Sequence, residues 1–199
     1  MNISTPEKIT EKNLNARAAQ SRTSLLEVTF KQFSQPKPGA PNISDLVKQA
    51  GVSRPTFYQH FKDADGLMRA AAFEKLNQVF ASLPQTDQEE VLTQQSFLQL
   101  LLGLQKEAIF FRNIMQTSGN ATLALELVGF IGNRLLAQPS IVHQLESKTQ
   151  GSNLKDYVQF IAAGVSWVTV HWLHSDFEGP NSPQAMSQRL TDLMRQALQ

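Results

Sequence analysis

The stretch "ISDLVKQAGVSRPTFYQHF", residues 43–61, decides how the N-terminal third of this chain folds. Asn42, just before it, is a good N-cap for a first short helix. Gly51 is a good end for that helix, because glycine readily takes the left-handed conformation that such a corner requires. Ser53 can cap a second short helix, and Pro55 falls in its first turn, where the missing N–H costs nothing. The stretch therefore predicts two short helices joined by a tight turn.

Apolar residues on the two helices are placed to hold them together. Leu46, Val47 and Ala50 share one face of the first helix, and Phe57 and Phe61 share one face of the second. When these faces pack against each other, the helices meet at a steep angle across the glycine turn. This is the pattern of a helix-turn-helix, in which the second helix is the recognition helix.

The polar groups at the start of the second helix suit contact with DNA. A helix N-terminus carries partial positive charge and free N–H groups, which favour a phosphate. Arg54 can reach a guanine edge or a phosphate, and Gln59 can pair with adenine. Tyr58 follows a buried residue, so it points outward, where its hydroxyl suits a phosphate oxygen. We expect DNA contacts from Asn42, Ser44, Lys48, Ser53, Arg54, Pro55, Thr56, Tyr58, Gln59, His60 and Lys62.

Some of these residues have an ordinary alternative role. Tyr58 and His60 can also be plain surface residues of a short helix. Lys48 can equally well contact a phosphate or be an ordinary solvated lysine.

The composition is that of a globular protein. The chain has 199 residues, of which 41% are apolar, enough to bury a core. It holds no apolar run near the roughly 18 residues that span a bilayer, and residues 1–20 lack the apolar segment of a signal peptide. With no cysteine, disulfides, thiolate nucleophiles and cysteine-ligated metals are excluded. We expect a cytoplasmic protein that does not enter the membrane.

The charges divide unevenly along the chain. Residues 1–62 carry nine Lys and Arg against four acids, and residues 63–199 carry nine against thirteen. This gives net charges of +5 and −4 for the two parts. A basic first third joined to an acidic remainder indicates a polyanion-facing head and a separate body.

Helix signals cover most of the rest of the chain, and no hairpin or repeat pattern appears. Residues 35–42 break the first helix with three prolines and a glycine. The β-branched residues 165–170 suit a strand, but the helical spacing of Tyr157, Ile161, Gly164 and Val168 favours a helix. We predict further helices over about 14–34, 64–83, 86–105 (opened by the capping pair Thr86 and Glu89), 106–116, 120–138, 153–176 and 183–197, with 140–151 as a loop or frayed turn.

Two segments resemble the TetR family of bacterial transcriptional regulators. The first comprises Leu25, Leu26, Phe30 and Phe33 followed by "ISDLVKQAGVSRPTFYQHFKDADGLMRAA", residues 43–71, with its specific "AGVSxxTxYxHF" core. The second, "FIAAGVSWVTVHWL" at residues 160–173 and the amphipathic helix after it, is similar in architecture to the last two helices of that family.

The resemblance implies an all-α fold in which an N-terminal three-helix helix-turn-helix domain joins a C-terminal helical bundle. It also implies a homodimer through the last two helices, bound to a pseudo-palindromic double-stranded DNA operator. In this family the C-terminal part often holds a small-molecule pocket, and ligand binding there releases the DNA. We divide the chain into a flexible tail at 1–13, a DNA-binding domain at 14–66 and a ligand-binding and dimerisation domain at 67–199.

The leading hypothesis is a homodimeric repressor released by a small molecule, apolar or anionic. An alternative is a DNA-binding regulator controlled by a protein partner. An enzyme is disfavoured, because the sequence has no GxSxG, no Gly-rich phosphate loop, no paired ExxH motifs and no catalytic spacing of its four histidines. We expect no cofactor and no metal, since the i, i+3 pair His171 and His174 is weak evidence for a metal site without a second cluster of ligands.

Bulky or polar residues of the middle helices are the candidates for the pocket. Arg112 and Arg134 lie in otherwise apolar helices and can bind an anionic ligand if they border a cavity. The small residues Ala162, Ala163, Gly164 and Ser166 suit either the dimer contact or packing within the chain. We predict a pocket lined by Phe97, Leu101, Phe111, Met115, Phe130, Trp167 and His171.

Two features depart from the family pattern. The connection between the first two helices, "SQPKPGAPN" at residues 34–42, is longer and richer in proline than the usual short turn. Ala64, between two aspartates, stands where many members have a basic residue, so phosphate contact shifts to Lys48 and Lys62. The basic residues of the N-terminal tail can reach a minor groove, or the tail can be a disordered terminus.

Overall fold

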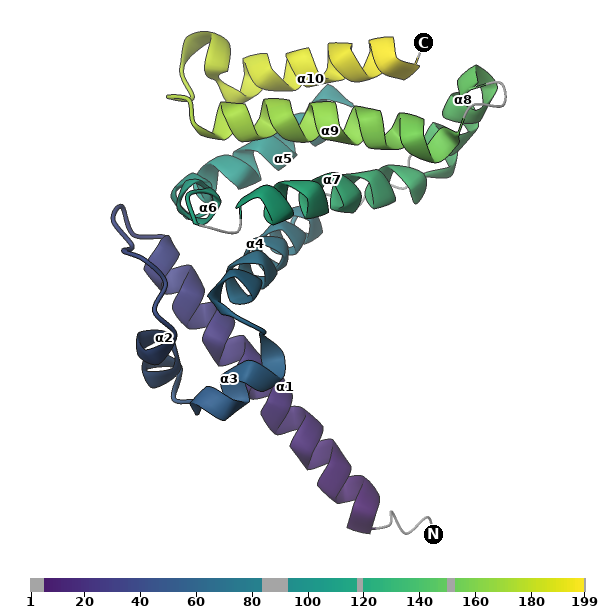
Figure 1. Ribbon diagram of the computed structural model, residues 1–199. Coiled ribbons are helices and arrows are strands. Elements are labelled where there is room, and N and C mark those ends of the chain that lie inside the picture. Colours follow the sequence, from purple (N-terminus) through teal and green to yellow (C-terminus); the bar gives the residue numbers. More distant parts are fainter. Residues whose placement is uncertain (1–5, 84–92, 118–119, 150–152, 199) are drawn as a thin grey trace.

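A computed structural model of the chain describes residues 6–83, 93–117, 120–149 and 153–198 (Figure 1). All regular elements in these residues are helices, which confirms the predicted all-α fold. They are α1 (Pro6–Phe33), α2 (Ile43–Ala50), α3 (Arg54–His60), α4 (Ala64–Ala81), α5 (Gln94–Lys106), α6 (Ala108–Met115), α7 (Asn120–Leu136), α8 (Pro139–Thr149), α9 (Leu154–Leu173), the short 3-10 helix η1 (Gly179–Asn181) and α10 (Pro183–Leu198).

Helices α1, α2 and α3 form the part that we call the head. The second half of α1 packs against α2, α3 and the start of α4, whereas its N-terminal end extends beyond them, away from the rest of the molecule (Figure 1). Leu25, Leu46 and Phe57, one from each helix, are completely buried. The apolar faces expected from the spacing of residues 43–61 therefore do form the core of the head.

Helices α4 to α10 form the part that we call the body. Helix α5 packs along α10, and α7 packs along α9. In Figure 1, α9 lies between α7 and α10, and α4 runs from the head up to the body. A Cβ at Gly103 of α5 would lie 2.8 Å from Val79 Cγ1 of α4, so only glycine lets these two helices approach so closely.

Two predicted helix starts differ from the structure. Helix α1 begins at Pro6, although its apolar period starts only near residue 14. Proline in the first turn and an acid beside it favour a helix start at this point. The helix that contains residues 94–105 begins at Gln94, because Thr93 caps it by accepting from Ser96 N at 3.1 Å. The predicted pair Thr86 and Glu89 lies outside the described residues.

Residues 139–149 are helical, so the loop predicted for 140–151 is wrong over that range. Pro139 occupies the first helical position, and Ile141 and Leu145, one turn apart, are buried. One pair of apolar residues in an otherwise polar segment is too short a pattern to predict a helix from the sequence. The helix predicted over residues 165–170 is confirmed, because these residues lie within α9.

None of the helices in the described ranges combines the length and the apolar character that crossing a bilayer requires.

Candidate DNA-binding surface and ligand cavity

The corner between α2 and α3 has the predicted geometry. Asn42 Oδ1 accepts from the backbone N–H of Ser44 at 2.9 Å, which caps α2. At the other end Gly51 is left-handed, with φ 67° and ψ 27°. Its N–H donates to Lys48 O, and the next N–H, of Val52, donates to Val47 O at 3.0 Å. These bonds satisfy the last carbonyls of α2 and fix the direction in which α3 leaves.

The start of α3 carries a pair of hydroxyl groups. Ser53 Oγ accepts from Thr56 N at 3.1 Å and lies 2.7 Å from Thr56 Oγ1. Because one hydroxyl hydrogen joins the two oxygens, the other remains to donate outward. The cap that starts the helix therefore also presents a hydrogen-bond donor beside the positive end of the helix.

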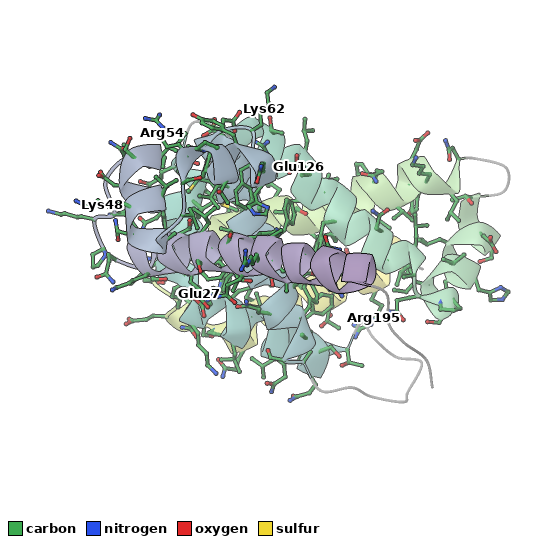
Figure 2. All side chains as sticks on the ribbon, turned by 90° about the horizontal axis from the view of Figure 1, so that it is seen from below. Glu27, Lys48, Arg54, Lys62, Glu126 and Arg195 are labelled. Carbon is green, nitrogen blue, oxygen red and sulfur yellow. The ribbon has the colours of Figure 1, made fainter. Side chains whose placement is uncertain are left out.

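The long side chains of α3 point outward. Tyr58 is 51% exposed and stands edge-to-face on the buried Phe57, with ring centroids 5.3 Å apart. Arg54 is exposed, and its Nη1 lies 3.5 Å from Ser44 Oγ of α2. Figure 2 shows Arg54, Lys62 and Lys48 extending away from the protein along the outer edge of the head.

These three cations are free to meet an anion. No ion pair between described residues involves Lys48, Arg54 or Lys62. The remaining predicted contact residues Asn42, Ser44, Pro55 and Gln59 are also exposed. The structure thus brings exposed cations, hydroxyls and an amide together on the α2–α3 side of the head, as a phosphate-binding and base-contacting surface requires.

Two predicted contact residues are less accessible than the others. Thr56 and His60 are half-buried, and His60 Nε2 is inside the protein with no hydrogen-bond partner among the described residues. The His60 ring also lies against Phe61, with centroids 6.1 Å apart. Its position as the last residue of the short α3 turns it toward the core, which the sequence pattern alone does not reveal.

The N-terminus of α4 is occupied by its own cap. Asp63 Oδ1 accepts from Gly66 N at 2.7 Å. The carboxylate satisfies one of the free N–H groups of this helix start, and its negative charge disfavours a phosphate there. This agrees with the absence of a basic residue at Ala64.

The body contains an apolar cavity enclosed by α4, α5, α6, α7 and α9. The volume of the cavity is about 70 Å³. Apolar side chains form nearly all of its wall, and no charged residue belongs to it. The lining residues are Ala72, Phe73, Leu76, Phe80, Leu100, Leu104, Phe111, Ile114, Met115, Leu123, Leu127, Ile131, Val165, Ser166, Thr169, Val170 and Leu173.

Only part of the predicted pocket lines this cavity. Phe111 and Met115 do, and Phe130 lies beside it, in tilted ring contacts with the lining residues Phe73 and Phe80. Phe97 and Leu101 are core residues that do not line it.

Trp167 and His171 lie outside the cavity, contrary to the prediction. Trp167 is 67% exposed, and its ring centroid is 4.5 Å from that of the exposed His171. The cavity is instead lined by Val165, Ser166 and Thr169 on the opposite face of α9. Both faces of α9 are apolar, so periodicity could not tell which face points inward.

The two candidate arginines also lie outside the cavity wall. Arg112 donates to the carbonyls of Leu173 and Ser175, and its guanidinium carbon lies 5.0 Å from the Phe177 ring centroid. Arg134 stacks over Phe80 at 4.0 Å, where partial burial lowers the pKa of its guanidinium. Both arginines therefore brace apolar surfaces rather than offer a charge to a bound anion.

Helix α6 and helix α4 connect the cavity to the head. Asn113 of α6 donates through Nδ2 to Phe33 O and Gln35 O, both at 2.8 Å, at the end of α1. Lys75 of α4 pairs with Glu107 at 3.4 Å and lies 4.7 Å from the ring centroid of Phe30. Both helices also line the cavity, so the same two helices contact the cavity and the C-terminal end of α1.

One face of α9 is apolar and uncovered. Phe160 is 77% exposed and Trp167 67% exposed, although both are large hydrophobic residues. The small residues Ala163 and Gly164 lie between them and are exposed as well. The other two small residues, Ala162 and Ser166, are buried and pack within the chain. An uncovered stripe of this kind, on a helix otherwise packed in the body, is typical of a protein contact surface.

In the part of the chain that the structure describes, no group of three or more His, Cys, Asp or Glu residues is placed to hold a metal ion.

Models of known protein families match both the head and the body of the chain. Residues 25–71 match the model described as bacterial regulatory proteins, tetR family. Residues 93–196 match a model described as transcriptional regulator C-terminal region, which covers more than half of the chain. A comparison with curated proteins finds no match. The helix-turn-helix head and the helical body, each matched by its own family model, show that the chain belongs to the TetR family and is a DNA-binding transcriptional regulator.

Proposed function

We propose that this regulator is a homodimeric repressor that leaves its operator when a small molecule fills the cavity of the body. The observation that carries the proposal is the double role of α4. Its N-terminal end follows the recognition helix after three residues, and its C-terminal half contributes Phe73, Leu76 and Phe80 to the cavity. A rigid helix that borders both sites transmits movement from one to the other.

The exposed face of α9 supports the homodimer. Two copies of the stripe around Phe160 and Trp167 can cover each other about a two-fold axis, because a two-fold contact uses the same patch on both subunits. A dimer presents two recognition helices, and these fit a pseudo-palindromic operator with half-sites about one helical turn or more apart. Such a protein acts where the chromosome is, which in bacteria is the cytoplasm.

Control by a protein partner is the second candidate, favoured by the same uncovered face of α9. The two candidates differ in what the cavity does. A small molecule that controls DNA binding must bind inside the body, whereas a protein partner covers the surface.

The decisive experiment is an affinity titration of the protein against the DNA upstream of its own gene. It is run at several salt concentrations beside a scrambled duplex. We expect tight, sequence-selective binding whose affinity falls steeply with salt, as phosphate contacts through Lys48, Arg54 and Lys62 require. Equal and weak binding to both duplexes, followed by failure to select any sequence from a random DNA pool, would contradict the proposal.

A compound screen by thermal shift then separates the two modes of control. Stabilisation by small apolar compounds, with release of the DNA, supports the repressor that responds to a small molecule. No stabilisation by any compound favours the protein partner.

A further inference from the structure

Ser166, one of the residues that line the cavity, has a buried hydroxyl with no hydrogen-bond partner among the described residues. Of the described residues, four polar ones are buried: Thr29, Ser166, Ser187 and Thr191. Three of them donate to a backbone carbonyl within the preceding turn of their own helix: Thr29 to Leu25 O, Ser187 to Gln184 O and Thr191 to Ser187 O, each at 2.8 Å.

Ser166 is the exception. It is only 6% exposed, and its Oγ makes no hydrogen bond with any described residue. The other three buried hydroxyls donate to a backbone carbonyl in the preceding turn of their own helix, whereas the Ser166 hydroxyl does not. Leaving a buried hydroxyl unpaired costs free energy, and a partner that enters the cavity from outside the chain would remove that cost.

The rest of the wall limits what that partner is. The cavity has no charged lining residue, so a charged compound would lose its hydration without gaining a counter-ion. Its volume of about 70 Å³ is several times the roughly 10–15 Å³ that one water molecule needs, which suits a small organic molecule. Thr169, the next lining residue of α9 in sequence, places a second hydroxyl one turn away.

We propose that the effector of this regulator is a small, neutral, mainly apolar compound with one hydroxyl or carbonyl group that hydrogen-bonds to Ser166. This rests on the proposed function, since it names the chemical class of the molecule that fills the cavity. It excludes the anionic class, because Arg112 and Arg134 are both engaged outside the wall.

The test uses pairs of compounds that differ in one polar group. Phenol and toluene have the same ring, as do benzyl alcohol and ethylbenzene, and benzoate supplies a charged probe. Binding to the full-length protein is measured by calorimetry. We expect the wild type to prefer the hydroxyl compound of each pair by about tenfold, which corresponds to one hydrogen bond to a buried group. Benzoate should not bind.

Ser166→Ala should reverse this preference, because toluene loses less than phenol on leaving water for a fully apolar cavity. Ser187→Ala is the matched control: it removes the hydroxyl of another buried serine, which lies outside the cavity, and it should leave the preference unchanged. The proposal is overturned if neither pair binds the wild type with a preference for the hydroxyl compound, or if Ser166→Ala keeps that preference.

The free protein supplies a second readout. Ser166→Ala removes an unpaired hydroxyl, so the melting temperature should stay the same or rise, whereas Ser187→Ala breaks a hydrogen bond and should lower it. An equal loss in both variants would show that Ser166 is already satisfied and would refute the proposal. Release of operator DNA is measured separately: phenol that binds through Ser166 without releasing DNA leaves the compound class intact and contradicts the repressor mechanism instead.

Discussion

At the scale of single residues, the head separates residues that shape the surface from residues that meet the DNA. Asn42 and Ser53 satisfy the backbone at the two helix starts, so their first role is structural. Arg54 and Tyr58 have no structural role of that kind, because their side chains project from the short α3 helix into solvent. Substituting them should therefore change DNA binding and leave the fold intact.

Arg54→Ala should weaken binding to the operator by about 1–3 kcal/mol and relax the base preference at one position of each half-site. The reason is that an exposed guanidinium beside the helix N-terminus can bind a guanine edge through two hydrogen bonds. Selection of binding sites from a random DNA pool checks this. Lys106→Ala, the loss of one exposed cation in the body, is the control. If the affinity falls equally for all sequences, Arg54 contacts a phosphate instead.

Tyr58→Phe should weaken binding to all sequences alike, by about 0.5–1.5 kcal/mol, since it removes one hydrogen bond and keeps the edge-to-face contact with Phe57. Titrations against the operator and against single-base variants of it measure the effect. An altered order of preference among these duplexes would show that the hydroxyl contacts a base.

At the scale of elements, the α2–α3 corner depends on one left-handed residue. Gly51 has φ 67°, and a Cβ there would meet no atom within 4 Å, so any cost of a side chain comes from the backbone conformation alone. In contrast, Gly129 lies inside α7 with ordinary helical dihedrals and has equally open space around its Cα. The same substitution at these two glycines should therefore have opposite effects.

Gly51→Ala should lower the free energy of unfolding by roughly 1–2 kcal/mol, because an L-residue is disfavoured in the left-handed region. Gly129→Ala should raise it by about 0.5–1 kcal/mol, because alanine is the better helix former. Urea unfolding of both variants gives the comparison. Equal stability of Gly51→Ala and the wild type would mean that the corner relaxes into a different turn.

At the scale of the whole molecule, the body is arranged to connect two surfaces. Its helices α4 and α6 contact α1 of the head, and α9 carries the exposed apolar stripe around Phe160 and Trp167. Because α9 also forms one wall of the cavity, the proposed dimer contact and the proposed effector share a single helix. In the proposed dimer, we expect a compound bound in the cavity to alter the spacing of the two heads.

The double variant Phe160→Glu/Trp167→Glu should be a monomer, because it places like charges in the middle of the proposed two-fold contact. Operator affinity should then fall on the order of a hundredfold or more, since one half-site is bound without the second. Light scattering gives the mass, and the DNA titration gives the affinity. Ile109→Glu, at another exposed apolar residue, is the control and should remain a dimer. A dimeric double variant would place the contact elsewhere.

The sequence by itself determined the elements whose signals are local. Asn42, Gly51, Ser53 and Asp63 act on backbone groups within four residues of themselves, so the two caps, the glycine turn and the start of α4 could be predicted and are confirmed. Arg54, Tyr58 and Lys62 are exposed because they lie off the apolar face that Phe57 and Phe61 define, and this spacing can be read from the sequence. Helix α8 does not follow from the sequence, because Ile141 and Leu145 alone are too short an apolar pattern to indicate a helix.

Only the tertiary structure decided which apolar face lies inside. Helix α9 has Phe160 and Trp167 on one face and Val165 and Val170 on another, and hydrophobicity does not distinguish a face that packs in its own chain from one left for a partner. The sequence pattern therefore places Trp167 and His171 in the cavity, and it gives no sign that Ser166 lines the cavity instead. Whether a hydroxyl has a hydrogen-bond partner depends on which groups surround it in the folded chain. A buried serine without a partner, such as Ser166, can therefore be recognised only in the tertiary structure.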